Sequence, residues 1–178
     1  MNGMPDDIAT IALEDVKARY KNLKTKAEKA YGQIPDEVWE QALSPEQNSI
    51  GVLVKHIAGN IRSRFTDFLT TDGEKPDRNR DSEFVLSEAD TPEALRERWE
   101  ASWAILFGEL AALTPSDLTR TVMLRNKEMD ALQALNNAHG HYAMHGGQIM
   151  MLGKYLTGDD WQVLSIPKGK SEEFFGRK

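Results

Sequence analysis

The sequence contains four histidines, at positions 56, 139, 141 and 145, and their spacing is what indicates chemistry. His141 and His145 are four positions apart, so on a helix both side chains lie on one face and can chelate one ion. At about 100° per residue, that face also carries a mostly apolar set: Ala131, Ala134, Ala138, Tyr142, Ile149, Leu152 and Leu156. The two imidazoles should therefore point into the protein. His139 lies on the same helix about 120° around the axis from His145, and it is therefore excluded as a ligand of the same ion.

Two imidazoles buried in an apolar stripe favour a metal ion, because each unmet polar group there costs about 1–3 kcal/mol. His56 is the only other histidine that can supply a third ligand. No Glu follows His141, so the HExxH arrangement is absent, and no ExxH pairs indicate a di-metal centre. A mononuclear three-histidine site with an open position remains, suited to Zn²⁺, Ni²⁺ or Fe²⁺. Such an ion polarises a carbonyl or lowers the pKa of a water or thiol.

The alternative is that the histidines are core residues, hydrogen-bonded to the backbone or to one another. If a metal is bound, its imidazoles need partners for their second nitrogens. The polar residues that could line a pocket or provide such partners are Asn60, Asp67, Tyr142 and Gln148. For each of these residues, a purely structural role is the competing interpretation.

Four stretches with helical periodicity must position these residues. Their expected ranges are 6 or 7 to 30, with acidic residues in the first turn, then 44–48 to 69, 92 to 113, and 128 or 129 to 156. The first should bury Ile8, Ile11, Val16, Tyr20 and Leu23, and the second a stripe from Ile50 to Phe68. Thr91-Pro92 marks the start of the third, whose Trp99 and Trp103 could pack in the core or anchor an interface. The pattern predicts an all-α four-helix bundle, with residues 1–178 forming a single domain.

Three other segments do not fit these helices. Residues 118–125 alternate and carry threonines, which predicts a short extended segment before the last helix. Residues 70–90 form a long, charge-rich connection, read either as a solvated mobile linker or as a lid or partner contact. The tail, residues 161–178, carries Trp161, Leu164, Ile166, Phe174 and Phe175 and is expected to pack on the body.

Composition narrows the class of protein. With 178 residues, 40% of them hydrophobic, the chain has enough apolar material for one core. The net charge of -6 disfavours a broad nucleic-acid interface. There is no cysteine, so any thiol chemistry must use the thiol of another molecule. The N-terminus shows no secretory signal and no window approaches a transmembrane span, so we expect a cytoplasmic protein without membrane contact.

Several motifs together resemble the DinB superfamily of four-helix bundles, also called YfiT-like metalloenzymes, and in particular a bacterial branch of uncharacterised function. The motifs that carry the resemblance are Asn48-Ser49-Ile50, residues 54–60 around His56, residues 66–76, Arg78-Asn79-Arg80-Asp81, Glu83-Phe84, residues 141–149 around the histidine pair, and residues 164–171. They extend over most of the chain and are far more specific than HxxxH alone.

The resemblance implies that His56, His141 and His145 bind a divalent ion, often within a homodimer. Relatives in the superfamily include metal-dependent hydrolases and transferases or isomerases that use low-molecular-weight thiols. A thiol cofactor would need cations for its carboxylates, and the candidates by residue type are Arg62, Arg64, Arg78, Arg80, Arg120 and Arg125. The competing interpretation is that these arginines pair locally, with residues 78–81 pinning the loop.

Two functions follow as hypotheses. The first is a metal-dependent hydrolase or thiol-dependent S-transferase acting on a small molecule, with no nucleic acid or membrane partner. The second is a non-catalytic metal-binding or stress-response interaction module, in which the ion is structural or absent and the segment 70–90 contacts a partner.

Overall fold

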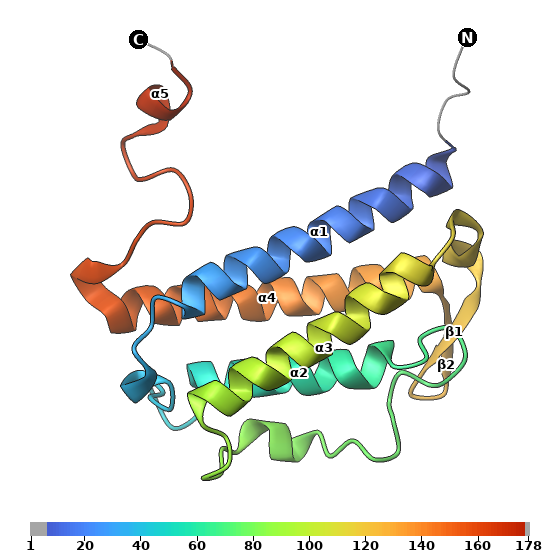
Figure 1. The fold of residues 1–178 in the computed structure, drawn as a ribbon, viewed down its shortest axis with the longest axis horizontal. Helices are drawn as coiled ribbons and strands as arrows, with labels where there is room; N and C mark the ends of the chain where they lie inside the picture. Colours follow the sequence, from blue (N-terminus) through green and yellow to red (C-terminus); the bar gives the residue numbers. More distant parts are fainter. Residues whose placement is uncertain (1–6, 177–178) are drawn as a thin grey trace.

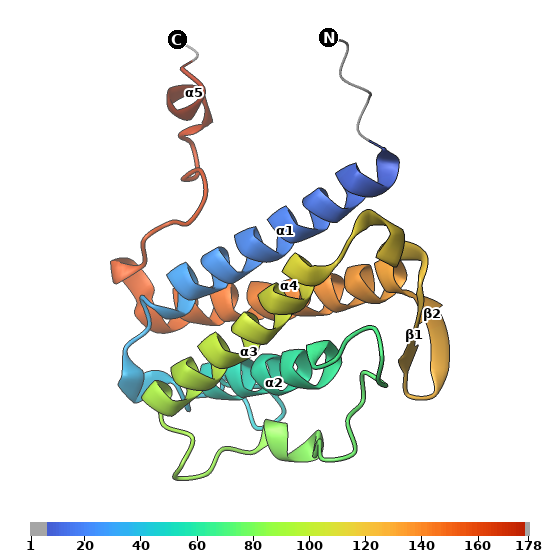
Figure 2. The same cartoon turned by 45° about the vertical axis from the view of Figure 1, so that its right-hand side comes forward.

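The computed structural model describes residues 7–176, most of which are helical. Helix α1 lies along α4, and α2 lies along α3, so that the four long helices surround a common core (Figures 1 and 2). The elements are α1 (Ile8–Tyr31), α2 (Ile50–Phe65), α3 (Pro92–Ala112), β1 (Thr121–Leu124), β2 (Lys127–Asp130), α4 (Ala131–Thr157) and α5 (Ser171–Phe174). The predicted predominance of helix is confirmed.

Helix α1 buries most of the stripe that its sequence predicted: Val16 and Tyr20 are buried, and Leu23 lies partly buried against the core. Ile8 and Ile11 are 82% and 58% exposed, so their predicted burial is wrong. Leu13 is buried instead, and at about 100° per residue Ile8 and Ile11 lie about 140° and 160° away from it. The predicted acidic first turn is also absent, because Asp7 precedes the helix without a side-chain capping bond and Asp6 lies outside the described residues.

Helix α2 is shorter at both ends than predicted. It begins at Ile50 because Ser49 caps it, accepting a hydrogen bond from the Val52 amide at 3.3 Å. It ends at Phe65, before Asp67, which has a left-handed backbone with φ of 52°. Phe68 still reaches the core from outside the helix.

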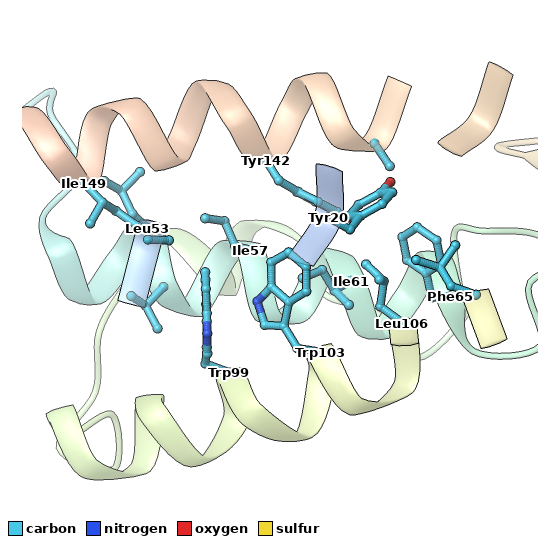
Figure 3. Packing of buried hydrophobic residues seen from close by; sticks show 14 of the residues in the cluster. Tyr20, Leu53, Ile57, Ile61, Phe65, Trp99, Trp103, Leu106, Tyr142 and Ile149 are labelled. Atoms are coloured by element: carbon cyan, nitrogen blue, oxygen red, sulfur yellow. The ribbon is translucent and has the colours of Figure 1, made fainter. Parts of the chain in front are cut away.

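The core is rich in aromatic residues, as Figure 3 shows. Trp99 and Trp103 are 1% and 0% exposed, so they pack inside and do not anchor an interface. Tyr20 crosses between helices, and its hydroxyl donates to the Leu135 carbonyl at 2.8 Å. The rings of Tyr20 and Trp103 also contact Tyr142 of α4, and that of Tyr20 contacts Phe65 of α2.

A β-hairpin precedes α4. The predicted extended segment is confirmed for β1, while Leu118 and Thr119 belong to a 3-10 turn. Residues 128 and 129, where the last helix was expected to start, form part of β2 instead. Helix α4 begins after Asp130, whose carboxylate accepts from the Gln133 amide at 2.7 Å, and it ends before Gly158, as predicted.

The segment between α2 and α3 is not a solvated linker. Ser63 donates to the Gly73 carbonyl at 2.8 Å, and a 3-10 helix at Asp81–Phe84 packs against α2. Glu83 and Asp90 are both buried. The charges that suggested solvation are therefore used in contacts with the helices.

Asp90 fastens the end of this segment. Its carboxylate accepts from Lys55 Nζ at 2.8 Å, from the Ser87 amide and hydroxyl at 2.8 and 2.7 Å, and from the Arg98 guanidinium. Burial alone would raise the pKa of Asp90, but these hydrogen bonds outweigh it and hold the pKa well below the ordinary value.

Because the folded-state pKa is depressed, the ionised Asp90 stabilises the fold above the unfolded-state pKa of about 3.9, and this contribution is lost as the pH falls below it. We expect Asp90→Asn to reduce the free energy of unfolding by about 1–3 kcal/mol at pH 7, with a smaller difference at pH 3. Urea titrations across this range measure it, with the exposed Asp81→Asn as the control. A difference independent of pH would contradict the assignment.

The tail packs over only part of its length. Trp161 and Leu164 lie partly buried against the core, whereas Phe174 and Phe175 are 66% and 60% exposed. Between the end of α4 and α5, the chain leads away from the four long helices (Figures 1 and 2). The predicted packed tail is therefore wrong for α5, and positions 177 and 178 lie outside the described residues. Within residues 7–176, no helix combines the length and apolarity needed to cross a bilayer.

Candidate metal centre

Three imidazoles from two helices converge between α2 and α4. The Nε2 atom of His141 lies 3.3 Å from Nε2 of His56 and 3.0 Å from Nε2 of His145. One ligand nitrogen from each residue falls within 4.8 Å of the others. His56 and His145 are buried, and His141 is partly exposed. The tertiary structure thus brings together the three histidines that the sequence singled out.

The remaining nitrogens of two of these rings fix their tautomers. His56 Nδ1 lies 2.8 Å from Glu83 Oε2, and a carboxylate only accepts, so Nδ1 carries the hydrogen. His145 Nδ1 lies 2.7 Å from the Gln148 amide oxygen, which assigns its hydrogen in the same way. The Nε2 atoms of His56 and His145 then carry no hydrogen, and the lone pair of each faces His141.

One hydrogen on His141 Nε2 can satisfy only one of these two lone pairs. Hydrogen bonding among the three rings therefore leaves at least one close contact between nitrogen acceptors, which a shared cation would relieve. A proton is a poor candidate, because burial and the neighbouring His145 and His56 lower the pKa of His141 to about 3. Burial also lowers the pKa of His145.

The spacing fits a single divalent ion. Two nitrogens bound at about 2.0–2.1 Å to a tetrahedral Zn²⁺ lie about 3.3 Å apart, close to the two contacts measured here. Among residues 7–176, no fourth His, Asp or Glu side chain joins the group. The donor set therefore leaves a coordination position without a protein ligand, as in catalytic sites.

Glu83 is the residue of this site whose role the sequence did not reveal. It accepts from Arg78 Nε and Nη2, both at 2.8 Å, while holding His56. Burial would raise the pKa of Glu83, but the hydrogen bonds from His56 and Arg78 keep it below its ordinary value. Arg78 also contacts Glu74 at 3.2 Å, and Arg125 reaches that carboxylate at 3.1 Å.

A general rule could have predicted a partner of this kind, because metal-binding histidines usually donate their second N–H to a carboxylate or carbonyl. Which carboxylate of the segment 66–91 would serve depended on how that segment folds back, and its local sequence does not encode this. His141 lacks such a partner, since its buried Nδ1 has none among the described residues.

The other predicted pocket residues differ in what they contact. Gln148 contacts a histidine directly, as given above. Asn60 and Tyr142 contact each other, with the Tyr142 hydroxyl donating to Asn60 Oδ1 at 2.9 Å. Asp67 is exposed beyond the end of α2, about three turns from His56, and contributes nothing to the site. His139 packs edge-on against Tyr20 at 5.4 Å between ring centroids, away from the triad.

Most of the candidate cofactor-binding arginines pair locally. Arg62 contacts Asp77 at 2.7 Å, Arg80 lies 3.6 Å from Asp81 and over the Phe84 ring, and Arg120 contacts Asp117 at 3.2 Å. Arg78 and Arg125 belong to the Glu83 network described above. Arg64 differs from these arginines because its buried Nε atom has no hydrogen-bond partner among the described residues.

Comparison with known proteins adds one finding. No curated protein and no solved structure gives a significant match to the chain. Residues 7–170 match the family described as "Protein of unknown function (DUF1572)". This match covers the four long helices, the hairpin and all three histidines. The chain therefore belongs to the DUF1572 family.

Proposed function

We propose that His56, His141 and His145 hold one divalent ion, and that the protein is a mononuclear metal-dependent enzyme. We further propose that the chain is a DinB-type four-helix bundle that forms a single domain. The observation that carries the metal proposal is the convergence of the three Nε2 atoms, at 3.0 and 3.3 Å, with at most one hydrogen to share between the two contacts. The motif resemblance supports the superfamily.

Bound there, Zn²⁺, Ni²⁺ or Fe²⁺ would supply Lewis acidity toward a carbonyl, or lower the pKa of a water or a thiol. The chain's own residues orient the donors: Glu83 sets the His56 ring and Gln148 sets the His145 ring. The partly exposed His141 gives the site a side that solutes can approach. We infer that the protein either hydrolyses a small-molecule substrate or transfers a low-molecular-weight thiol to it. We also infer that the protein is a homodimer.

Metal analysis of protein purified without a histidine tag tests the proposal. We expect one equivalent of a divalent metal per chain after reconstitution, and a chain that stays folded when a chelator removes it. Loss of the fold with the metal would identify a structural ion and support the non-catalytic alternative, because ligand binding then contributes folding free energy. Absence of metal binding would refute the proposal. Turnover of a panel of thiols and electrophiles by the Zn²⁺, Ni²⁺ and Fe²⁺ forms distinguishes transfer from hydrolysis.

Gly59 gives a test that changes neither a ligand nor a charge. A Cβ atom at this position would lie 2.5 Å from Glu83 Oε1 and 2.9 Å from its Cδ, so Gly59→Ala must displace the Glu83 carboxylate. Because Glu83 orients His56, we expect metal affinity to fall by about 10- to 100-fold. Competition with a fluorescent chelator measures this change.

Gly108→Ala is the matched control, because nothing lies within 4 Å of a Cβ atom there and Gly108 is also within a helix. We expect unchanged metal affinity and a gain in stability of up to about 1 kcal/mol from the better helix propensity of alanine. Equal metal affinity in Gly59→Ala and the wild type would show that Glu83 does not position His56.

A further inference from the structure

A cleft of about 260 Å³ opens between α2 and α3, and none of the three histidines lines it. The lining residues of each helix recur at spacings of three and four, so they occupy a single helical face. On α2, His56 lies about 100° around the axis from Lys55, which lines the cleft. The cleft is therefore a cavity distinct from the metal centre.

The walls of the cleft are mainly apolar. Ala58 and Gly59 of α2 face Ala101 and Ile105 of α3, and the small side chains at the first three positions leave the space open. At about 30 Å³ for each molecule, the cleft has room for about nine waters. Water finds few hydrogen-bond partners on such walls, so an apolar group that displaces it gains free energy.

Three cations border these apolar walls, namely Lys55, Arg62 and Arg98. Lys55 and Arg98 share a single carboxylate, that of the buried Asp90, so these three groups together have a net charge of +1. Arg62 pairs with Asp77, but both side chains are about 60% exposed, and such a pair contributes at most about 1 kcal/mol. The charge around the cleft therefore favours an anion.

The same cations keep N–H donors that the fold does not use. A lysine has three donors and an arginine has five. Among the described residues, Lys55 donates to the Val85 carbonyl and to Asp90, and Arg98 donates to Asp90 and to the Ala89 carbonyl. The side chain of Arg62 donates through one nitrogen, Nη2, to Asp77. Each cation thus has a donor left for a ligand.

Glu83 forms the wall between the cleft and the metal centre. Its side chain lines the cleft, while its carboxylate accepts from His56 and Arg78. These hydrogen bonds compensate the negative charge of Glu83, so it does not cancel the attraction of the three cations for an anion.

We propose that this cleft binds a small organic carboxylate with an apolar body, at a site separate from the metal centre. The apolar body fills the space between α2 and α3, and the carboxylate accepts hydrogen bonds from the bordering cations. Because the ligand lies on the opposite side of Glu83 from His56, its binding requires no metal. The inference therefore does not rest on the proposed function.

Calorimetric titration of the full chain tests this site after a chelator has removed any metal and has itself been dialysed away. The probes are octanoate, its neutral counterpart octanamide, and acetate, which has the charge without the apolar body. We expect octanoate to bind at least about tenfold more tightly than either of the others. Absence of octanoate binding, or equal affinity for octanoate and octanamide, would refute the proposal.

A variant that fills the cleft locates the site. Ala101 is exposed and lines the cleft, so Ala101→Leu occupies the space without changing a charge or a core residue. We expect it to weaken octanoate binding by at least about tenfold. Ala104→Leu is the matched control, because Ala104 is exposed on the same helix but does not line the cleft. Unchanged affinity in Ala101→Leu would show that octanoate binds elsewhere and would overturn the assignment.

A charge variant tests the role of the cations. In Arg62→Gln/Arg98→Gln we expect the affinity for octanoate to fall to that for octanamide, while the affinity for octanamide stays the same. The readout is the ratio of the two affinities within one variant, so a general loss of packing does not imitate it. Arg120→Gln is the control, since Arg120 pairs with Asp117 outside the cleft. A preference for octanoate that survives in Arg62→Gln/Arg98→Gln would contradict the proposal.

Discussion

Replacing His141 with alanine is expected to lower the affinity for a divalent ion by more than about 100-fold, beyond the effect typical of losing a residue that only orients a ligand. His141 Nε2 lies 3.3 and 3.0 Å from the Nε2 atoms of His56 and His145, so its removal takes away one of the three donors. It is also the ligand whose loss should disturb the fold least, because it is partly exposed and its Nδ1 has no partner to be stranded.

His56 is a poorer choice for this experiment. Its Nδ1 holds Glu83, which in turn compensates the buried Arg78, so His56→Ala would combine the loss of a ligand with a disturbed ion pair. His139→Ala is the appropriate control, since His139 lies on the same helix and packs against Tyr20. We expect His139→Ala to retain one equivalent of metal.

Metal content by mass spectrometry and affinity by chelator competition measure the effect of His141→Ala, and circular dichroism verifies the fold. In the metal-free state, His141→Ala should be about as stable as the wild type, because it removes contacts between lone pairs along with the ring. Wild-type metal content in His141→Ala would show that the ion binds elsewhere.

Replacing Trp103 with alanine is expected to reduce the free energy of unfolding by about 3–5 kcal/mol, the range for large aromatic residues in a core. Trp103 is fully buried, and its ring lies 5.4 to 6.3 Å, centroid to centroid, from those of Trp99, Phe107, Tyr20 and Tyr142. The surrounding aromatic rings are held by several helices and cannot collapse fully into the space left behind (Figure 3).

Phenylalanine substitutions separate packing from hydrogen bonding in this cluster. The buried Nε1 of Trp103 has no hydrogen-bond partner within residues 7–176, whereas Nε1 of Trp99 donates to Glu28 Oε1 at 3.1 Å. Trp103→Phe therefore loses volume but no hydrogen bond, and we expect it to be milder than Trp99→Phe by about 1 kcal/mol. Urea unfolding of Trp103→Ala, Trp103→Phe and Trp99→Phe measures the differences. A larger loss for Trp103→Phe would contradict this account of the two indoles.

The sequence alone determined the features that depend on local periodicity and capping. The spacing of His141 and His145 placed both rings on one helical face, and Thr91-Pro92 set the start of α3. The burial of Trp99, Trp103 and the stripe from Ile50 to Phe65 also followed from residues three and four apart. These patterns extend over one or two helical turns, so they can be recognised in the sequence without knowledge of the tertiary contacts.

Features that depend on how distant segments meet were decided by the tertiary structure. Val16 and Tyr20 of the predicted stripe are buried, but the exposed Ile8 and Ile11 show that an apolar pattern does not specify which residues of α1 meet a neighbouring element. Phe174 and Phe175 likewise show that apolar residues at a chain end need not pack against the body.

The same distinction applies to the candidate site. The sequence could nominate three histidines as ligands, but their meeting depends on how α2 packs beside α4. The part played by Glu83 depends on the fold-back of a segment whose charges locally resemble those of a solvated linker. The buried Nε of Arg64 has no hydrogen-bond partner among the described residues, and this too depends on which groups the fold brings within reach, which neighbouring sequence positions do not specify.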